Sequence, residues 1–307
     1  MRICVLIFSA VLAQAQSSTS RYEVDINGRR VETERSSSAG GTRSEYTQSI
    51  NGRPVPLEQT EEKILSEGPS GKVVERIVRK FDPTGRQNGM ERVLIEEEKL
   101  AGGGLNVKQT VWRSDINGAM REAERRQAET RVSGNSTTTQ TVVSRPDING
   151  SFSTAERRSA VAEKNGDTVQ STEVLQRRDT NGQFYDASRE VKVVTKQGDR
   201  TSEQTTSYAP DVTGRLDVAS QSVSTSTKQP DGTLVKEVNV YSNHADGHAV
   251  ERGTGTQVQE QQIVERKKAA DGSIVESVSI RRPSVSDPGR LGSAQKVQET
   301  VCRGKCD

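Results

Sequence analysis

The sequence predicts an all-β chain of tandem hairpin repeats, each about 32 residues long, that form an extended, twisted antiparallel β-meander. Three observations predict it: evenly spaced glycines, a second series of turns halfway between them, and Thr- and Val-rich segments with little proline. The glycines are Gly28, Gly52, Gly85, Gly118, Gly150, Gly182, Gly214, Gly247 and Gly289. From Gly52 to Gly247 the intervals are 33, 33, 32, 32, 32 and 33 residues, which indicates one unit copied in tandem.

Most of these glycines close a turn of the form Asp-x-Asn/Thr-Gly. The Asp side chain can accept hydrogen bonds from the backbone ahead of it, and Gly tolerates a positive φ at the fourth position. Because Thr84 and Thr213 at the third position tolerate positive φ poorly, we expect a type I turn followed by a glycine bulge instead of a type I′ turn. The predicted structural turns are at Gly85, Gly118, Gly150, Gly182 and Gly214.

The segments between turns are about 11 to 13 residues long, and most have strand-favouring composition. Residues 90–100 and 121–131 have helix-favouring composition instead. We divide the chain into a signal peptide (1–15), less regular N-terminal repeats (16–70), a core of hairpin repeats (71–250), and an expanded last repeat with a cysteine-containing tail (251–307).

The register of the hairpins follows from apolar residues on either side of each marker glycine. An apolar residue seven positions before the glycine should face the residue five positions after it. The expected cross-strand pairs are Val78 with Met90, Val111 with Ala123, Val143 with Ala155, and Leu175 with Ala187. A parallel solenoid would stack equivalent arginines about 4.8 Å apart, so the antiparallel meander is favoured.

Composition limits the core that this chain can build. It is 30% hydrophobic and 3% aromatic with a net charge of +2, which favours a thin, solvated sheet and makes disorder of the whole mature chain an alternative. One Trp, five Tyr and four Phe cannot form two interfacial girdles, which disfavours an outer-membrane barrel, and we expect no membrane span. The interspersed charges give no support for nucleic-acid binding.

The first fifteen residues have the pattern of a cleavable export signal. Arg2 supplies the positive charge, Ile3 to Leu12 form a short apolar run, and Ala13-Gln14-Ala15 matches a small-x-small cleavage site. We therefore expect a secreted protein, periplasmic or extracellular.

Few residues are candidates for a chemical site. Cys302 and Cys306 are predicted to form a disulfide, within the chain or between chains, and are too few for zinc. His244 and His248 flank a turn, so exposed turn residues are favoured over a weak metal site. Trp112 and Tyr208 could contact a sugar, but filling the apolar column is favoured. The sequence predicts no cofactor, no metal and no catalytic residue.

The Asp-x-Asn-Gly turns also invite comparison with calcium loops. A calcium loop needs an oxygen ligand two positions before the aspartate. That position holds a basic residue or an alanine, at Lys80, Arg113, Arg145, Arg177 and Ala209. Turn formation is therefore the better explanation of these aspartates.

Phe81-Asp82-Pro83-Thr84-Gly85-Arg86 resembles the core of a YD repeat of the Rhs type, and Tyr208 to Leu216 resembles a stretched version. That family consists of secreted bacterial proteins whose repeats form antiparallel β-strips that curl into shells or stalks. The resemblance covers turn cores only, and it implies exported antiparallel repeats without implying an activity.

From these observations the sequence predicts an exported, non-catalytic structural or adhesive protein of the bacterial surface, periplasm or matrix. The alternative is a module that binds a glycan or a protein through one sheet face. The partner would then be a surface polymer, a glycan or another protein.

Overall fold

The computed structural model describes residues 17–25, 30–38, 40–50, 53–115, 117–242, 244–245, 248–249, 258–284 and 290–304. Eighteen of its strands form one sheet. They are β1 (Ser17–Asp25), β2 (Arg30–Ser38), β3 (Gly41–Ile50), β4 (Arg53–Gly68), β5 (Gly71–Phe81), β6 (Gln87–Lys99), β7 (Leu105–Ser114), β8 (Met120–Ser133), β9 (Ser136–Pro146), β10 (Phe152–Asn165), β11 (Thr168–Arg178), β12 (Phe184–Gln197), β13 (Arg200–Pro210), β14 (Leu216–Lys228), β15 (Leu234–Ser242), β18 (Val258–Lys268), β19 (Ile274–Arg281) and β20 (Gln295–Arg303).

Two short strands, β16 (His244–Ala245) and β17 (His248–Ala249), pair with each other outside this sheet. A single 3-10 turn, η1 (Ala101–Gly103), connects β6 to β7. The segments with helix-favouring composition are strands β6 and β8. Cross-strand pairing therefore overrides the intrinsic propensity of these residues.

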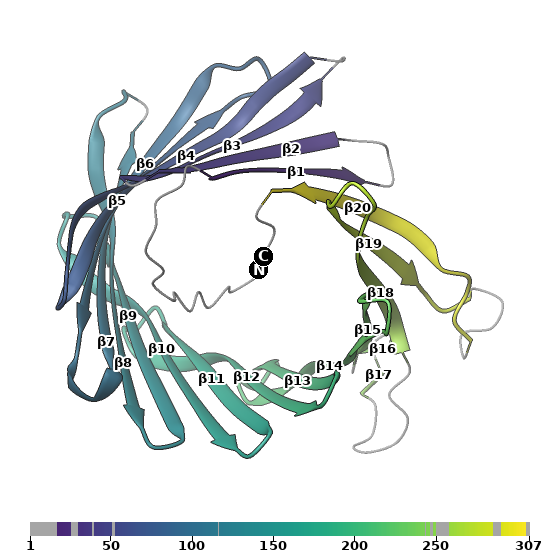
Figure 1. The fold of residues 1–307 in the computed structure, drawn as a ribbon. Coiled ribbons are helices and arrows are strands. Elements are labelled where there is room, and N and C mark those ends of the chain that lie inside the picture. Colours follow the sequence, from purple (N-terminus) through teal and green to yellow (C-terminus); the bar gives the residue numbers. More distant parts are fainter. Residues whose placement is uncertain are drawn as a thin grey trace.

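The sheet is an antiparallel meander that closes on itself. Each strand pairs with the next one along the chain, except that β15 pairs with β18. The first and last strands also pair, from Ser20 with Arg303 to Asp25 with Gln298, so the wall forms a closed barrel (Figure 1). The predicted antiparallel meander is confirmed, but the predicted extended, twisted strip is wrong, because this β1–β20 pairing closes the sheet into an 18-stranded barrel.

The Asp-x-Asn/Thr-Gly turns connect the strands at one end of the barrel. In the turn between β9 and β10, the Gly150 N–H donates to the Asp147 carbonyl at 3.0 Å, and the Asp147 N–H donates to the Ser151 carbonyl at 2.9 Å. Five glycines in equivalent turns have φ between +80° and +83°: Gly85, Gly118, Gly150, Gly182 and Gly214. This is the geometry of a type I turn followed by a glycine bulge.

The aspartates of these turns hold the backbone in place. In the turn between β13 and β14, the Asp211 carboxylate accepts hydrogen bonds from the Thr213 hydroxyl and the backbone N–H groups of Thr213 and Arg215. These hydrogen bonds hold the pKa of Asp211 below its usual range. The bond from the Thr213 hydroxyl has the largest effect, and the bond from the Arg215 N–H has the next largest. The resulting stabilisation is present at neutral pH and is lost as the pH falls through that lowered pKa.

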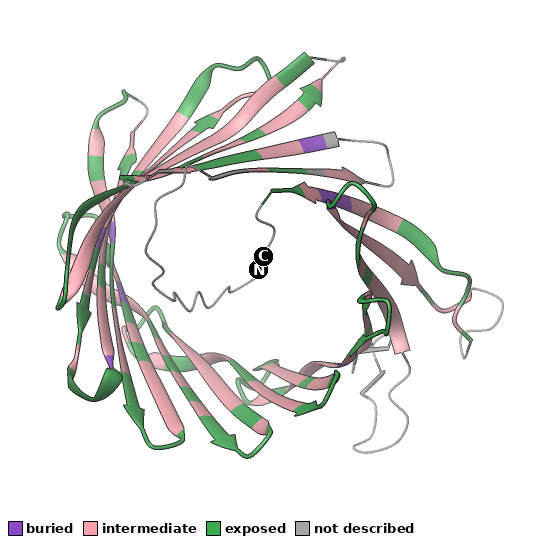
Figure 2. Ribbon diagram, viewed as in Figure 1, coloured by how far each residue is buried: buried purple, intermediate pink, exposed green. Residues whose placement is uncertain are grey.

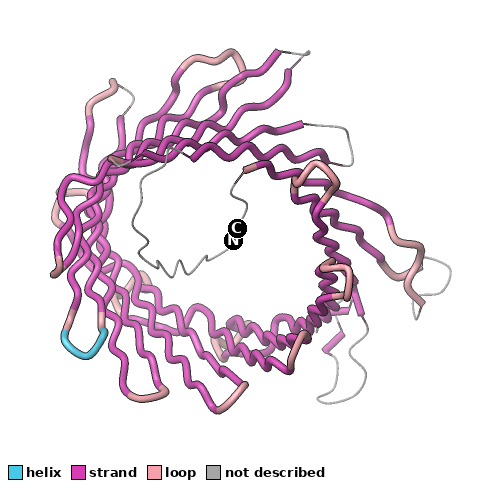
Figure 3. Tube along the Cα trace, in the orientation of Figure 1, coloured by secondary structure: helices cyan, strands magenta, loops and turns pink. Residues whose placement is uncertain are grey.

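A second set of turns, shorter than the first, connects the strands at their opposite ends. Figure 3 shows the turns and loops of the barrel in pink. Residues 134–135, 166–167 and 198–199 connect β8 to β9, β10 to β11 and β12 to β13. Gly134, Gly166 and Gly198 have φ of +56°, +59° and +57°. These two-residue connections explain why turns recur about every 16 residues through the middle of the chain.

The register of the hairpins differs from the prediction by one residue. Val111 pairs with Glu124 instead of Ala123, and Val143 pairs with Glu156 instead of Ala155. The register shifts near Ala123 and Ala155, where an extra residue interrupts the pairing as a β-bulge does. Val78 with Glu91 and Leu175 with Ser188 show the same one-residue difference.

The core is thin, and most strand residues are only partly buried (Figure 2). Val93, Ile95 and Val111 form a buried cluster, against which Val74 and Val107 pack. Cross-strand pairing therefore carries much of the stability of this wall, because so little apolar surface is enclosed.

Gly214→Ala is expected to lower the free energy of unfolding by about 1–2 kcal/mol, because alanine is strained at φ +81°. No atom lies within 4 Å of the added Cβ, so the backbone strain is not combined with a steric clash. Urea titration followed by circular dichroism measures the change. Gly89→Ala is the control, since its Cβ would meet only the Lys80 Cβ at 3.8 Å and its φ is outside the left-handed region. Equal effects of the two substitutions would contradict this account of the turn.

Candidate functional site

A cavity of about 610 Å³ lies at one end of the β1–β20 seam. Its lining comes from both ends of the chain: Thr19 and Ser20 from β1, Arg303 and Gly304 at the end of β20, and residues of β2 and β3. Ser20 pairs with both Arg303 and Glu34, which places the three strands side by side at this point. Closure of the barrel therefore creates the cavity.

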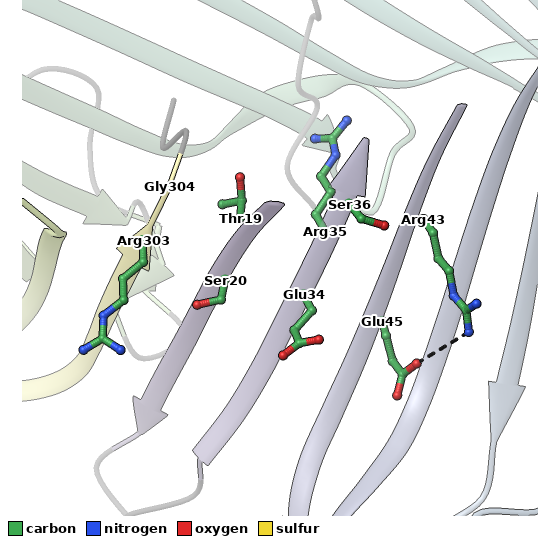
Figure 4. Close-up of a pocket in the computed structure, with 9 residues that line it drawn as sticks. All are labelled: Thr19, Ser20, Glu34, Arg35, Ser36, Arg43, Glu45, Arg303 and Gly304. Carbon is green, nitrogen blue, oxygen red and sulfur yellow. Dashed lines mark ion pairs between the residues drawn. The ribbon is translucent and has the colours of Figure 1, made fainter. Parts of the chain in front are cut away.

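The charged groups of the cavity point in different directions. Figure 4 shows Ser20 and Glu34 between Arg303 on one side and Arg43 with Glu45 on the other. Arg43 is 4.0 Å from Glu45, and Arg303 is 3.9 Å from Asp271. The guanidinium groups diverge, so the cavity mixes charges of both signs and does not present one convergent ion site.

The barrel wall carries charge on both faces. Paired residues on adjacent strands share a face, and one row across β4 to β8 consists of Glu62, Arg76, Val93, Val111 and Glu124. We call this the first face. The neighbouring row, on the second face, consists of Glu61, Ile77, Arg92, Trp112 and Glu122. Neither row is a continuous apolar band.

A network of ion pairs crosses the first face from β8 to β11. Its centre is Glu124, whose side chain is only 2% exposed. The Glu124 carboxylate accepts hydrogen bonds from Arg126 and, at 2.9 Å, from Arg145. Arg145 also reaches Glu156 at 3.2 Å, and Glu156 lies 3.9 Å from Arg177. The network joins the strands through charge where apolar side chains are scarce.

The second face carries arginine side chains stacked on aromatic rings. The Arg125 guanidinium lies 4.1 Å from the ring centre of Phe152, and Arg157 lies 4.1 Å from that of Phe184. Trp112 and Tyr208, the residues that could contact a sugar, lie under Arg92 and Arg189 at 5.1 and 5.9 Å. The rings thus pack against cations within the wall.

The other residues singled out in the sequence do not form a site. Cys302 lies in β20 and is disulfide-bonded, while Cys306 is outside the described residues, so the Cys302–Cys306 pairing stays a prediction. His244 and His248 lie in β16 and β17, where Ala245 pairs with His248. Within the described ranges, no group of three or more His, Cys, Asp or Glu side chains is arranged to hold a metal ion. The export signal is also outside the described residues.

The seam cavity was missed by the sequence analysis. Ser20 and Arg303 lie at opposite ends of the chain, and no motif marks either residue. Only the closure of the sheet brings them together.

The fold is similar to that of a porin of known structure. A mutant of the porin of Rh. blastica matches with a TM-score of 0.53 and 8% sequence identity, covering 95% of this chain and 100% of the porin. The outer membrane protein opdK of Pseudomonas aeruginosa matches with a TM-score of 0.49 and 8% identity, covering 94% and 97% of the two chains. No protein-family model and no curated protein sequence matches this chain.

This likeness in fold corrects several predictions from the sequence. The resemblance to YD repeats of the Rhs type is wrong, because the chain closes into a barrel whose fold is similar to that of a porin. The likeness in fold to a porin also overturns three other predictions. They are the structural or adhesive role, the module that binds a glycan or protein through one sheet face, and the expected absence of a membrane span. The described residues include no helix of the length and apolarity needed to cross a bilayer.

Proposed function

We propose that this chain is a porin-like β-barrel of the bacterial outer membrane, through which small polar solutes cross. The observation that carries the proposal is the closure of 18 antiparallel strands by pairing of β1 with β20. Barrels of 16 to 18 strands are wide enough to leave an aqueous channel. The export signal predicted at residues 1–15 is consistent with such a protein, because an outer-membrane barrel must first cross the inner membrane. A location in the cell envelope, and not in the external medium, is part of this proposal and is supported by the likeness in fold to a porin.

The charged side chains of the wall affect both parts of this proposal, the passage of polar solutes and the insertion of the barrel into a membrane. Charged and hydroxyl side chains suit a wall that lines water, and they favour passage of polar solutes over apolar ones. The same charges make contact with lipid costly, since an unpaired Arg or Lys at the bilayer midplane costs about 2–4 kcal/mol. Ion pairs such as Arg76 with Glu62 and Arg92 with Glu75, both at 2.6 Å, neutralise part of this charge. Insertion is thus the most demanding step of the proposed function.

Purified mature chain, added to a planar lipid bilayer, is expected to produce stepwise increases in conductance. The step size should be similar from one event to the next, because one closed barrel of fixed strand number forms each channel. Heat-unfolded chain is the control. A chain that stays in the aqueous phase when liposomes are floated, and that gives no conductance steps, would overturn the proposal.

A further inference from the structure

We propose that the barrel wall opens sideways at the β1–β20 seam, starting at the cavity. The seam is the only join of the 18-stranded sheet, in the described residues, whose two strands come from opposite ends of the chain. Adjacent hairpin strands that separate remain tethered by a turn. No turn joins the two seam strands, which are separated by most of the length of the chain, so re-forming their pairing requires closure of a much longer loop.

Among adjacent strands of the 18-stranded sheet, the seam also has the fewest paired residues in the part of the chain that the structure describes. Six residue pairs join β1 to β20, whereas ten join β10 to β11 and eleven join β9 to β10. Fewer pairs mean fewer backbone hydrogen bonds to break, so local opening should require less free energy at the seam than at the central hairpins.

The two halves of the seam are packed differently. At one end, Ser20 and Arg303 are paired and both line the cavity of about 610 Å³. Toward the other end, Thr300 pairs with Glu23, which pairs with Val31. Thr300 and Val31 are only 3% and 8% exposed. Opening therefore begins at Ser20 and Arg303, and the row of Thr300 and Val31 holds the remaining pairs closed.

Hydrogen exchange of the folded mature chain, measured by mass spectrometry, tests this inference. Amides of β1 and β20 are expected to exchange at least about tenfold faster than amides of β9 and β10. A disulfide across the seam, from Val24→Cys with Glu299→Cys, should remove the difference, because the two positions are paired residues. Each single cysteine variant is the control for the substitution itself.

A second pair of variants tests the role of Val31. Val31→Ala is expected to accelerate exchange in β1 and β20 by a further factor of about ten. Val143→Ala is the matched control, since Val143 is also buried but lies in β9, and it should not accelerate exchange selectively at the seam.

Two results would overturn the inference: seam amides that exchange as slowly as those of β9 and β10, or a cross-link that leaves their exchange unchanged. Neither depends on conductance. A barrel that fails the bilayer experiment can still open at its seam, and a conducting barrel can have a seam that stays shut.

Discussion

Gly71→Ala is expected to destabilise the barrel by about 3 kcal/mol. Gly71 begins β5 and pairs with Glu98 of β6. A Cβ at this position would lie 1.9 Å from the backbone carbonyl oxygen of Glu97 and 2.9 Å from its carbonyl carbon. Backbone atoms cannot rotate away as a side chain can, so β5 and β6 would have to separate at this point.

The unfolding midpoint in urea, followed by the fluorescence of the single residue Trp112 in β7, measures this loss. Gly68→Ala is the matched control in the same turn, because nothing lies within 4 Å of its added Cβ. The account of close backbone approach fails if Gly71→Ala unfolds at the same urea concentration as the wild type, or if the two variants are destabilised equally.

Glu124→Gln is expected to lower the free energy of unfolding by about 2 kcal/mol. The substitution removes the charge from a side chain that is 2% exposed and accepts hydrogen bonds from two arginines. Because Arg126 and Arg145 are each 47% exposed, water can solvate part of their unpaired charge, and the loss is smaller than for a fully buried ion pair.

Glu129→Gln in the same strand is the control for Glu124→Gln. Glu129 pairs with Arg131, but the two side chains are 37% and 78% exposed. An exposed pair of this kind contributes little, so the expected loss is under about 0.5 kcal/mol. Equal losses in the two variants, measured by urea titration, would show that burial of Glu124 does not set the strength of its ion pairs.

The strands and turns of this barrel could be predicted from the sequence because they depend on local chemistry. Glycine at the fourth turn position and aspartate at the first act within a few residues of each other, and they recur together in most of the units. The one-residue difference in register arises from bulges such as the one near Ala123. An alanine can also occupy a regularly paired position, so the residue type does not predict that the ladder leaves it out.

Closure could not be predicted, because it depends on strands that the chain order keeps far apart. The sequence of β1 does not mark β20 as its pairing partner, and the sequence of β20 does not mark β1, because other polar strands have similar residues. The small number of aromatic residues disfavours an outer-membrane barrel only through contact with lipid, and this criterion does not bear on whether the strands close into a ring. The seam cavity and the Glu124 network follow from closure and from register, and were missed with them.

The neighbour-to-neighbour order of the meander, which only β16 and β17 interrupt among the described strands, has a consequence for how such a protein can change in size during evolution. Insertion or deletion of one hairpin would add or remove two strands, so that 18 strands would become 20 or 16. The count stays even, and the terminal strands still meet in opposite directions. The number of hairpins therefore determines the circumference of the barrel, and a wider or narrower barrel requires no new architecture.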